Sequence, residues 1–413
     1  MSLPVELWRE IFFHATHVRG VLATEWDYDP DDHVWCGWKP VEDTSIGTKR
    51  AIVQVCREWR AIGVEFLYEA IDIRAHTTAP YYLGLDRLVS IMRDSSVELD
   101  SEEGSEVGYG RWIKRVNITT DLLNVENDFG SLVSLLNLCY NLSILSIDGN
   151  DHPDRATFQL AEIVQTRFPH SLRRLSTKVH DTNAHRVFLP FIPLRTLDVK
   201  VDHQLSDLQG RFSFETITTL TIYFGGGAVL NSDSDSLYFP SLRTLSLKNI
   251  RLPDYTVLNH FVERHSETLR SLHLQPSLAS MKMPVLISQA TRLKSVSFDE
   301  ADFMELCEGT PRDSIPTSFP GITHLGIVAY HRAHYLGKCL KGVGLILASK
   351  MFPNLTLARL LDLNEDIPFR EEWAAVIEMC GNEGVRLLDG KGQELACIES
   401  SATAGEVDDA IIL

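Results

Sequence analysis

The chain has 413 residues, of which 44% are apolar and 23% are charged, and its formal net charge is −17 at pH 7. This composition is typical of a soluble globular protein, and no run of about 18 apolar residues predicts a membrane span. Acidic residues concentrate in residues 20–45, 94–106 and 392–413, which predicts solvated loops and a tail. The sequence shows no basic face that would indicate nucleic-acid binding.

The cysteines and the N-terminus indicate a compartment. Seven cysteines, an odd number without paired spacing, favour free thiols in a reducing environment. Glu6, Arg9 and Glu10 interrupt any apolar stretch that could act as a secretory signal. We therefore expect the protein in the cytoplasm, the nucleus or both.

Residues 3–12, LPVELWREIF, predict a first helix. Pro4 suits the first turn, where its missing N–H needs no partner. Leu7 and Ile11 are four residues apart and so share one helical face, and Leu3 precedes them.

Residues 14–48 predict a long loop, because they hold three tryptophans, two prolines and the acidic run DYDPDD. The acidic spacing is similar to that of a calcium loop, but Asp32 replaces the glycine and Trp38 the final glutamate of an EF-hand. His14 and His17 have the spacing of metal ligands without nearby partners, so a place on the helix surface is the better interpretation.

Residues 49–63, KRAIVQVCREWRAIG, predict a second amphipathic helix that ends near Gly63. The residues spaced like one face of this helix are Ile52, Val55, Cys56 and Trp59. Residues 66–73, FLYEAIDI, then become strand-like. The apolar side chains of this first rung are Tyr68, Ile71 and Ile73.

These segments together resemble the F-box, especially the F-box proteins of mushroom-type (basidiomycete) fungi. The features that carry the resemblance are Leu3-Pro4, Glu6-Leu7, Ile11, Val55-Cys56-Arg57 and Trp59. In those proteins a loop rich in acidic, proline and aromatic residues often splits the domain, as residues 14–48 do here. The resemblance implies docking on the Skp adaptor of Skp–cullin–F-box ubiquitin ligases. The implied contact residues are Leu3, Pro4, Leu7, Ile11, Val55, Cys56 and Trp59.

A helical unit of this size is too small to bury its own apolar face, and an exposed apolar patch usually marks a partner site. The alternative is that residues 3–63 cap the open end of a repeat array, as terminal repeats must. Both roles are compatible with the sequence.

An apolar triad at relative positions 0, +3 and +5 recurs through the rest of the chain. Its copies are Ile113/Val116/Ile118, Leu142/Leu145/Ile147, Leu172/Leu175/Thr177, Leu194/Leu197/Val199, Ile217/Leu220/Ile222, Leu242/Leu245/Leu247, Leu269/Leu272/Leu274, Leu293/Val296/Phe298, Ile322/Leu325/Ile327 and Leu355/Ala358/Leu360. Most gaps between copies fit the roughly 20–29-residue period of leucine-rich repeats. Positions +3 and +5 share one face of a strand, and stacked repeats bury these faces together. The alternative is a set of unrelated strands in an ordinary α/β protein.

Helical patterns separate the triads, at residues 83–93, 132–140, 158–168, 256–265, 344–352 and 370–380. An acidic loop is expected at 94–106 and a closing strand at 384–390. Phe-Pro pairs stand just before four strands, and their phenylalanines are expected to pack between layers. They are Phe168-Pro169, Phe239-Pro240, Phe319-Pro320 and Phe352-Pro353.

The sequence contains no GxSxG, HExxH or paired CxxC motif. Gly225–Gly227 lacks the Gly-Lys-Ser/Thr of a phosphate loop and is better interpreted as a flexible link. His324, His331, His334 and Cys339 could bind zinc, but surface or packing roles are the better interpretation.

In a curved repeat array the strand positions +2, +4 and +6 line the concave face. Here they are mostly small and polar, with lysines on three rungs. We predict a groove for an acidic or phosphorylated client segment. The candidate contacts are Arg174, Lys178, Lys200, Tyr223, Lys248 and His273. The alternative is an ordinary solvated strand face.

The sequence therefore predicts an α/β fold, with an N-terminal helical F-box followed by a curved leucine-rich-repeat solenoid. The expected domains are 1–75 (F-box-like, with the 14–48 insertion), 76–391 (solenoid) and 392–413 (acidic, disordered tail). The expected function is a non-catalytic receptor of a ubiquitin ligase, which binds the Skp adaptor, through it a cullin, and a client, without cofactor or metal. The alternatives are an interaction scaffold outside any ligase, and an enzyme or small-molecule sensor with a pocket in the solenoid.

Overall fold

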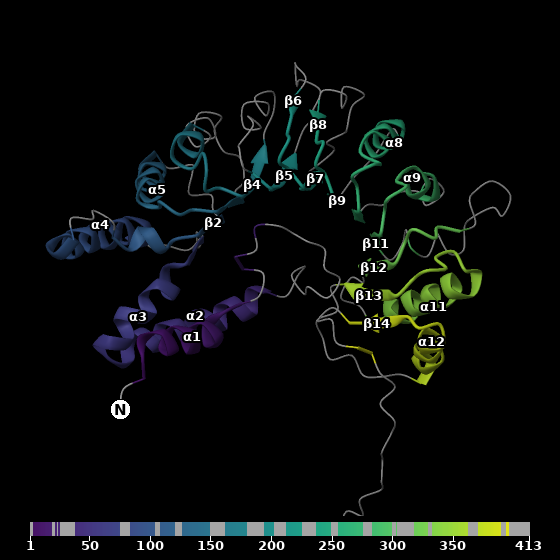
Figure 1. The fold of residues 1–413 in the computed structure, drawn as a ribbon, viewed down its shortest axis with the longest axis horizontal. Coiled ribbons are helices and arrows are strands. Elements are labelled where there is room, and N and C mark those ends of the chain that lie inside the picture. The colour runs from purple at the N-terminus through teal and green to yellow at the C-terminus, as the bar shows by residue number, and fades with distance from the viewer. Residues whose placement is uncertain are drawn as a thin grey trace, which may run out of the picture.

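The computed structural model is an arch of strands and helices with a helical unit at its N-terminal end (Figure 1). The residues it describes are 3–18, 21–22, 24, 38–74, 83–103, 108–119, 126–148, 162–179, 194–201, 212–224, 237–248, 255–275, 283–299, 303, 318–328, 333–361, 371–389 and 394–395. The acidic run DYDPDD, Gly225–Gly227, His331 and most of the predicted tail lie outside these residues.

The helical unit consists of α1 (Val5–Thr16), α2 (Trp38–Val55) and α3 (Arg57–Tyr68). Phe12, Ile52 and Ile62 form its buried core, and Trp8 and Trp59 pack against them. The ring centroids of Trp8 and Trp59 are 4.7 Å apart, so an aromatic cluster joins α1 to α3.

Several expectations for this unit are wrong. Residues 66–68 of the predicted strand-like segment 66–73 belong to α3, and the strand itself begins at Ala70. α2 begins at Trp38, so residues 38–48 of the predicted loop are helical. The predicted single helix over 49–63 is two helices, because the backbone of Cys56 is extended (φ −157°, ψ 173°) and breaks the helical hydrogen-bond pattern.

Gly63 does not end a helix, since α3 continues to Tyr68. It lies where α3 crosses α2. A Cβ at this position would be 2.7 Å from Cγ2 of Ile52, so the missing side chain allows the close approach of the two helices.

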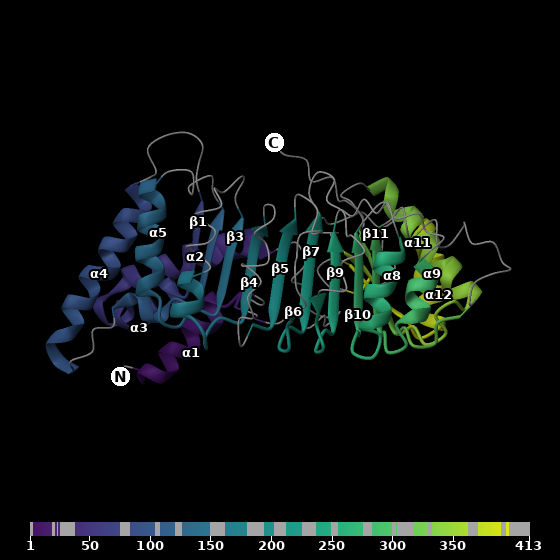
Figure 2. The ribbon, with the colours of Figure 1, turned by 90° about the horizontal axis from the view of Figure 1, so that it is seen from above.

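Within the described residues, twelve strands form one parallel sheet along the concave side of the arch (Figures 1 and 2). They are β1 (Ala70–Arg74), β2 (Arg115–Thr119), β3 (Ile144–Asp148), β4 (Arg174–Val179), β5 (Thr196–Val201), β7 (Thr219–Phe224), β9 (Thr244–Lys248), β10 (Ser271–Gln275), β11 (Ser295–Asp299), β12 (His324–Val328), β13 (Leu357–Leu361) and β14 (Arg386–Leu388). Each strand pairs with the next along the chain, as stacked repeats require, and β6 (Phe212–Ser213) pairs with β8 (Leu237–Tyr238) in a separate small sheet.

The register aligns the +3 position of every triad. The aligned residues, from β1 to β14, are Ile71, Val116, Leu145, Leu175, Leu197, Leu220, Leu245, Leu272, Val296, Leu325, Ala358 and Leu387. All ten predicted triads are buried in one continuous core, against which the first-rung residues Tyr68, Ile71 and Ile73 pack. The predicted solenoid is confirmed.

Helices cover the outer, convex side (Figure 1). They are α4 (Leu83–Glu103), the 3₁₀ helix η1 (Tyr109–Trp112), α5 (Glu126–Leu138), α8 (Tyr255–Arg264), α9 (Met283–Gln289), α11 (Ala333–Ser349) and α12 (Glu371–Asn382). The expectation of an acidic loop at 94–106 is wrong for residues 94–103, which are helical because α4 continues to Glu103. α9 was not predicted. Of the predicted helix 158–168 the structure describes residues 162–168, and residues 162–167 are helical.

The Phe-Pro phenylalanines pack between layers, as predicted. Phe168, Phe239, Phe319 and Phe352 are all buried. The rings of Phe239 and Phe214 stack with centroids 5.0 Å apart, and those of Phe319 and Phe352 are 5.9 Å apart. These contacts join adjacent repeats below the sheet.

α3 leads directly into the first strand of the sheet. The ring of Tyr68 stacks on Tyr109 of η1 with centroids 5.2 Å apart. Glu69 accepts a hydrogen bond of 2.8 Å from Nζ of Lys114, just before β2. The helical unit is thus attached to the N-terminal end of the solenoid by side-chain contacts as well as by the chain.

Candidate protein-interaction surfaces

α1 has an apolar face that points away from its neighbours. Phe12 and Thr16 are buried on the inner side of the helix, which leaves the spacing Leu3, Leu7, Ile11 on the outer side. Leu7 is 49% exposed, and Leu3 and Ile11 are each 45% exposed. Large apolar side chains that share one exposed face are the usual mark of a protein partner.

Pro4 sets the start of this helix. Its φ of −55° suits a helix start, and its carbonyl oxygen accepts hydrogen bonds from the amides of Leu7 and Trp8 at 3.1 and 3.2 Å. Pro4 is itself exposed, so it lies at the end of the apolar face of α1.

The sequence predicts that Val55, Cys56 and Trp59 share one helical face with Ile52. In the structure they do not, because the helix breaks at Cys56. Val55 is 61% exposed at the end of α2, and Cys56 is exposed at the break. The side chain of Cys56 caps α3, because its Sγ accepts a hydrogen bond of 3.4 Å from the amide of Trp59. Trp59 is half-buried and packs on Trp8.

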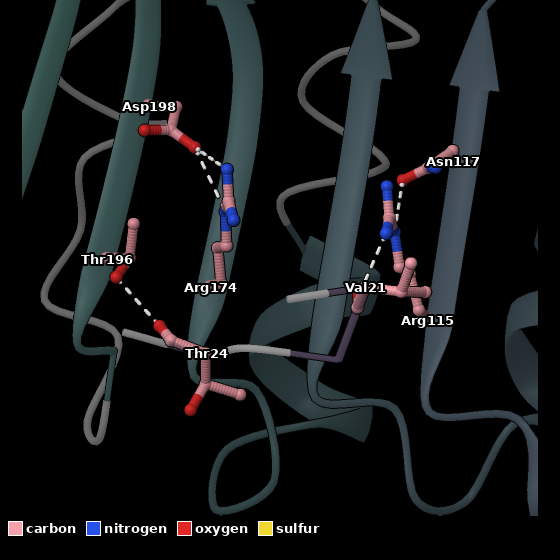
Figure 3. Close-up of polar contacts among 7 residues, drawn as sticks. All are labelled: Val21, Thr24, Arg115, Asn117, Arg174, Thr196 and Asp198. Carbon is pink, nitrogen blue, oxygen red and sulfur yellow. Dashed lines mark hydrogen bonds and ion pairs between the residues drawn. The ribbon is translucent and has the colours of Figure 1, made fainter. Parts of the chain in front are cut away.

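On the concave face of the sheet, the first residues of several neighbouring strands align in a row, and most of them are polar. On neighbouring strands the register aligns Arg115, Ile144, Arg174, Thr196 and Thr219. Arg174 binds Oδ2 of Asp198 on the next strand through both Nε (3.1 Å) and Nη2 (2.8 Å), and both side chains are largely buried (Figure 3). The charge of Arg174 is therefore neutralised within the sheet.

A part of the chain between α1 and α2 lies on this row (Figure 3). Nη1 of Arg115 donates a hydrogen bond of 2.8 Å to the carbonyl oxygen of Val21, and Nε donates one of 3.0 Å to Oδ1 of Asn117. Oγ1 of Thr196 donates a hydrogen bond of 2.7 Å to the carbonyl oxygen of Thr24. Arg115, Thr196 and Val21 are all buried.

Four of the predicted client contacts are neighbours in the register. Lys178 on β4 aligns with Lys200 on β5, Lys200 with Tyr223 on β7, and Tyr223 with Lys248 on β9. Tyr223 is 41% exposed and Lys248 is partly exposed. These positions form a second row, at the opposite end of the strands from Arg174 and Thr196.

His273 is not at the surface, in contrast to its predicted role as a client contact. It is 2% exposed, and its Nδ1 lies 2.7 Å from Oγ of Ser297 on the next strand. Burial, with a smaller contribution from the charge of Lys248, lowers the pKa of His273 to about 3. A neutral, buried imidazole bound to Ser297 serves the packing of the sheet.

His265 is a second buried histidine, which sequence reasoning did not single out. Its Nδ1 lies 2.7 Å from the carbonyl oxygen of Phe261, and its Nε2 accepts a hydrogen bond of 3.2 Å from the amide of Phe239. Burial lowers the pKa of His265. The residue therefore links α8 to the preceding repeat in its neutral form.

Three histidines that the sequence offered as possible metal ligands, His14, His17 and His324, contact side chains of the protein itself. His14 is exposed on α1, with its Nε2 3.8 Å from a carboxylate oxygen of Glu10, and the ring of His17 stacks on Phe13. Nδ1 of His324 lies 2.8 Å from Oγ1 of Thr323. Within the part of the chain that the structure describes, no group of three His, Cys, Asp or Glu residues could hold a metal ion. Nor is any helix among those residues long and apolar enough to cross a membrane.

Comparison with known proteins identifies no close relative. No protein-family model and no curated protein matches the chain. Among solved structures, the crystal structure of a TLR13–ssRNA13 complex is similar to 68% of this chain with 12% identity and a TM-score of 0.32. The chain spans 46% of that structure. The class of the protein is nevertheless defined by its own strand register and buried triads. It is an α/β leucine-rich-repeat-like solenoid with an N-terminal helical region, a fold of protein-interaction scaffolds.

Proposed function

We propose that this protein is the substrate-recognition subunit of a Skp–cullin–F-box type ubiquitin ligase. Its N-terminal helical unit would bind the Skp adaptor, and its solenoid would hold a client protein. The observation that carries this proposal is the exposed apolar face of α1, formed by Leu3, Leu7 and Ile11, on a unit whose sequence resembles the F-box.

The exposed apolar face of α1 does not contribute to the core of the helical unit. Its core is formed by Phe12, Ile52 and Ile62 with the rings around them, and α1 contributes only its inner side. Burying a large aliphatic side chain contributes roughly 1.5–3 kcal/mol, so covering three of them would stabilise a complex substantially. Pro4, Val55 and Cys56 are also exposed and remain proposed contacts, whereas Trp59 would act mainly by holding α3 against α1.

The mechanism would be proximity. The solenoid holds the client while the adaptor and cullin hold a charged ubiquitin carrier, and tethering raises the effective concentration of client lysines near that carrier. The protein itself needs no catalytic group for this role, which would place it in the cytoplasm or the nucleus.

The test is binding of the full chain to a purified Skp adaptor, measured by biolayer interferometry. Leu7→Asp with Ile11→Asp should weaken binding at least a hundredfold, because two charges would replace two apolar contacts. Val285→Asp is the matched control, since Val285 on α9 is similarly exposed at 40% but lies on the solenoid. Equal binding by the double variant and the control would refute the proposal.

A second candidate is an interaction scaffold outside any ligase, with the helical unit as an end cap. The contacts of Tyr68 with Tyr109 and of Glu69 with Lys114 favour it, because they attach the unit to the open end of the solenoid. Failure of the unaltered chain to bind the Skp adaptor would select this candidate.

A further inference from the structure

Two residues between α1 and α2, Val21 and Thr24, contact the concave face of the solenoid. Val21 is held at β2 by Arg115, and Thr24 is held at β5 by Thr196 (Figure 3). In sequence these contacts bridge 94 and 172 residues. The chain therefore brings a piece of its N-terminal region onto the surface where a repeat protein receives its partners.

The two contacts lie on strands that are three apart in the sheet. β2 and β5 are separated by three strand intervals, about 14 Å at the usual spacing of parallel neighbours. Val21 lies in a turn, where its amide donates a hydrogen bond of 3.2 Å to the carbonyl oxygen of Val18, and the long side chain of Arg115 reaches it from β2. The two contacts thus reach across the strands rather than along one of them.

Further contacts fix the start of the segment between α1 and α2. Oγ of Ser45 on α2 donates a hydrogen bond to the carbonyl oxygen of Thr16, the last residue of α1. The side chain of Val21 is 7% exposed, although valine at a loop position is commonly open to water. The segment is therefore held on the side of the helical unit as well as on the sheet.

The chemistry of the contacts indicates what else this surface can bind. The donors are side chains of the sheet, and the acceptors are main-chain carbonyl oxygens. Such donors bind carbonyl oxygens of the peptide main chain, which every residue carries. The residues that follow Thr24 in the sequence, EWDYDPDD, hold five acidic residues, so the occupant is the start of an acidic peptide.

We propose that Arg115 and Thr196 form a docking site for main-chain carbonyl groups of an acidic peptide, and that Val21 and Thr24 occupy this site in cis. A client segment of the same chemistry takes the site by displacing Val21 and Thr24. This role rests on the repeat half of the proposed function, a partner held by the solenoid, and does not involve the adaptor.

The test uses a fluorescein-labelled synthetic peptide of residues 18–32, VRGVLATEWDYDPDD, and the full chain. Fluorescence anisotropy measures its Kd for the unaltered chain and for a chain from which residues 19–25 are deleted. Removing the cis occupant should tighten binding at least tenfold. Where circular dichroism shows that this chain is not folded, Val21→Ala with Leu22→Ala should tighten binding about threefold.

Thr196→Val, placed in the chain without the cis occupant, should weaken peptide binding about threefold to tenfold, the loss of one hydrogen bond. Thr219→Val is the matched control, because Thr219 aligns with Thr196 on the next strand, and it should leave the Kd unchanged. Equal affinity with and without residues 19–25, or equal weakening by the two threonine variants, would overturn the proposal. Both outcomes are independent of adaptor binding, so this role and the ligase role can fail separately.

Discussion

The helical unit and the solenoid treat their apolar residues in opposite ways. The solenoid aligns its triads into one core that runs from β1 to β14, and the side chains at its aligned positions are nearly all inaccessible. The helical unit has a small core around Phe12 and leaves Leu7 and Ile11 about half exposed. A repeat array covers its own apolar surface except at its ends, whereas a three-helix unit of this size needs a further surface to cover it.

The largest expected effect that separates the two regions is on stability. Leu245→Ala, in the central strand β9, should lower the free energy of unfolding by about 2–5 kcal/mol, because it leaves a cavity in a fully buried layer. Leu7→Ala on α1 should lower it by less than about 0.5 kcal/mol, as an exposed position without a cap or core contact. Urea unfolding followed by circular dichroism measures both.

Equal losses for Leu245→Ala and Leu7→Ala would contradict the comparison. They would mean that the apolar face of α1 is covered in the free protein. The proposed adaptor site would then lack the exposed surface on which it depends.

The two regions also differ in how far their sequences predicted them. The solenoid triads were predictable because the same need to bury three apolar side chains recurs ten times at a similar spacing. A single deviating copy, such as the one that ends in the polar Thr177, does not hide this pattern. The helical unit has no repeated pattern, so an error in predicting one of its helices is not corrected by the others. The spacing of Val55 and Cys56 continues a helical pattern, yet the backbone breaks there, since Cys56 caps a new helix instead.

The contacts of Val21 and Thr24 with the sheet had no signal in the sequence. Their acceptors are main-chain carbonyls, which every residue carries, and their partners are 94 and 172 residues away. The concave residues were predicted from alternation along the strands, but alternation does not tell which of them the chain itself covers. For this reason the predicted client contacts include the buried His273 but not Arg115 or Thr196.

A smaller effect on stability is expected when the pH is lowered from 7.5 to 5.5. The pKa of His273 is lowered to about 3 from an ordinary value near 6.5, so the unfolded chain binds a proton that the folded chain does not. Stability therefore falls as pH drops below about 6.5. Between pH 7.5 and 5.5 the loss from this residue is about 1.4 kcal/mol, and His265 adds to it in the same direction.

His273→Asn measures the share of this single residue, since asparagine has no proton to gain over this range. Its urea unfolding midpoint should shift less between pH 7.5 and 5.5 than that of the unaltered chain. An unchanged shift would show that His273 titrates normally in the folded protein and is therefore open to water. In that case it would again qualify as a client contact.

The smallest expected effect concerns the junction between α2 and α3. Cys56→Ala removes the Sγ that accepts the amide of Trp59, so the first turn of α3 should open more readily by about 0.5–1 kcal/mol. Cys56→Ser keeps an acceptor with better capping ability and should protect that turn at least as well. Hydrogen exchange at the amides of residues 57–60 resolves this local change, which global unfolding of the solenoid would hide. Faster exchange in both variants would show that the thiol acts by packing rather than by capping, and that the break between the two helices has another cause.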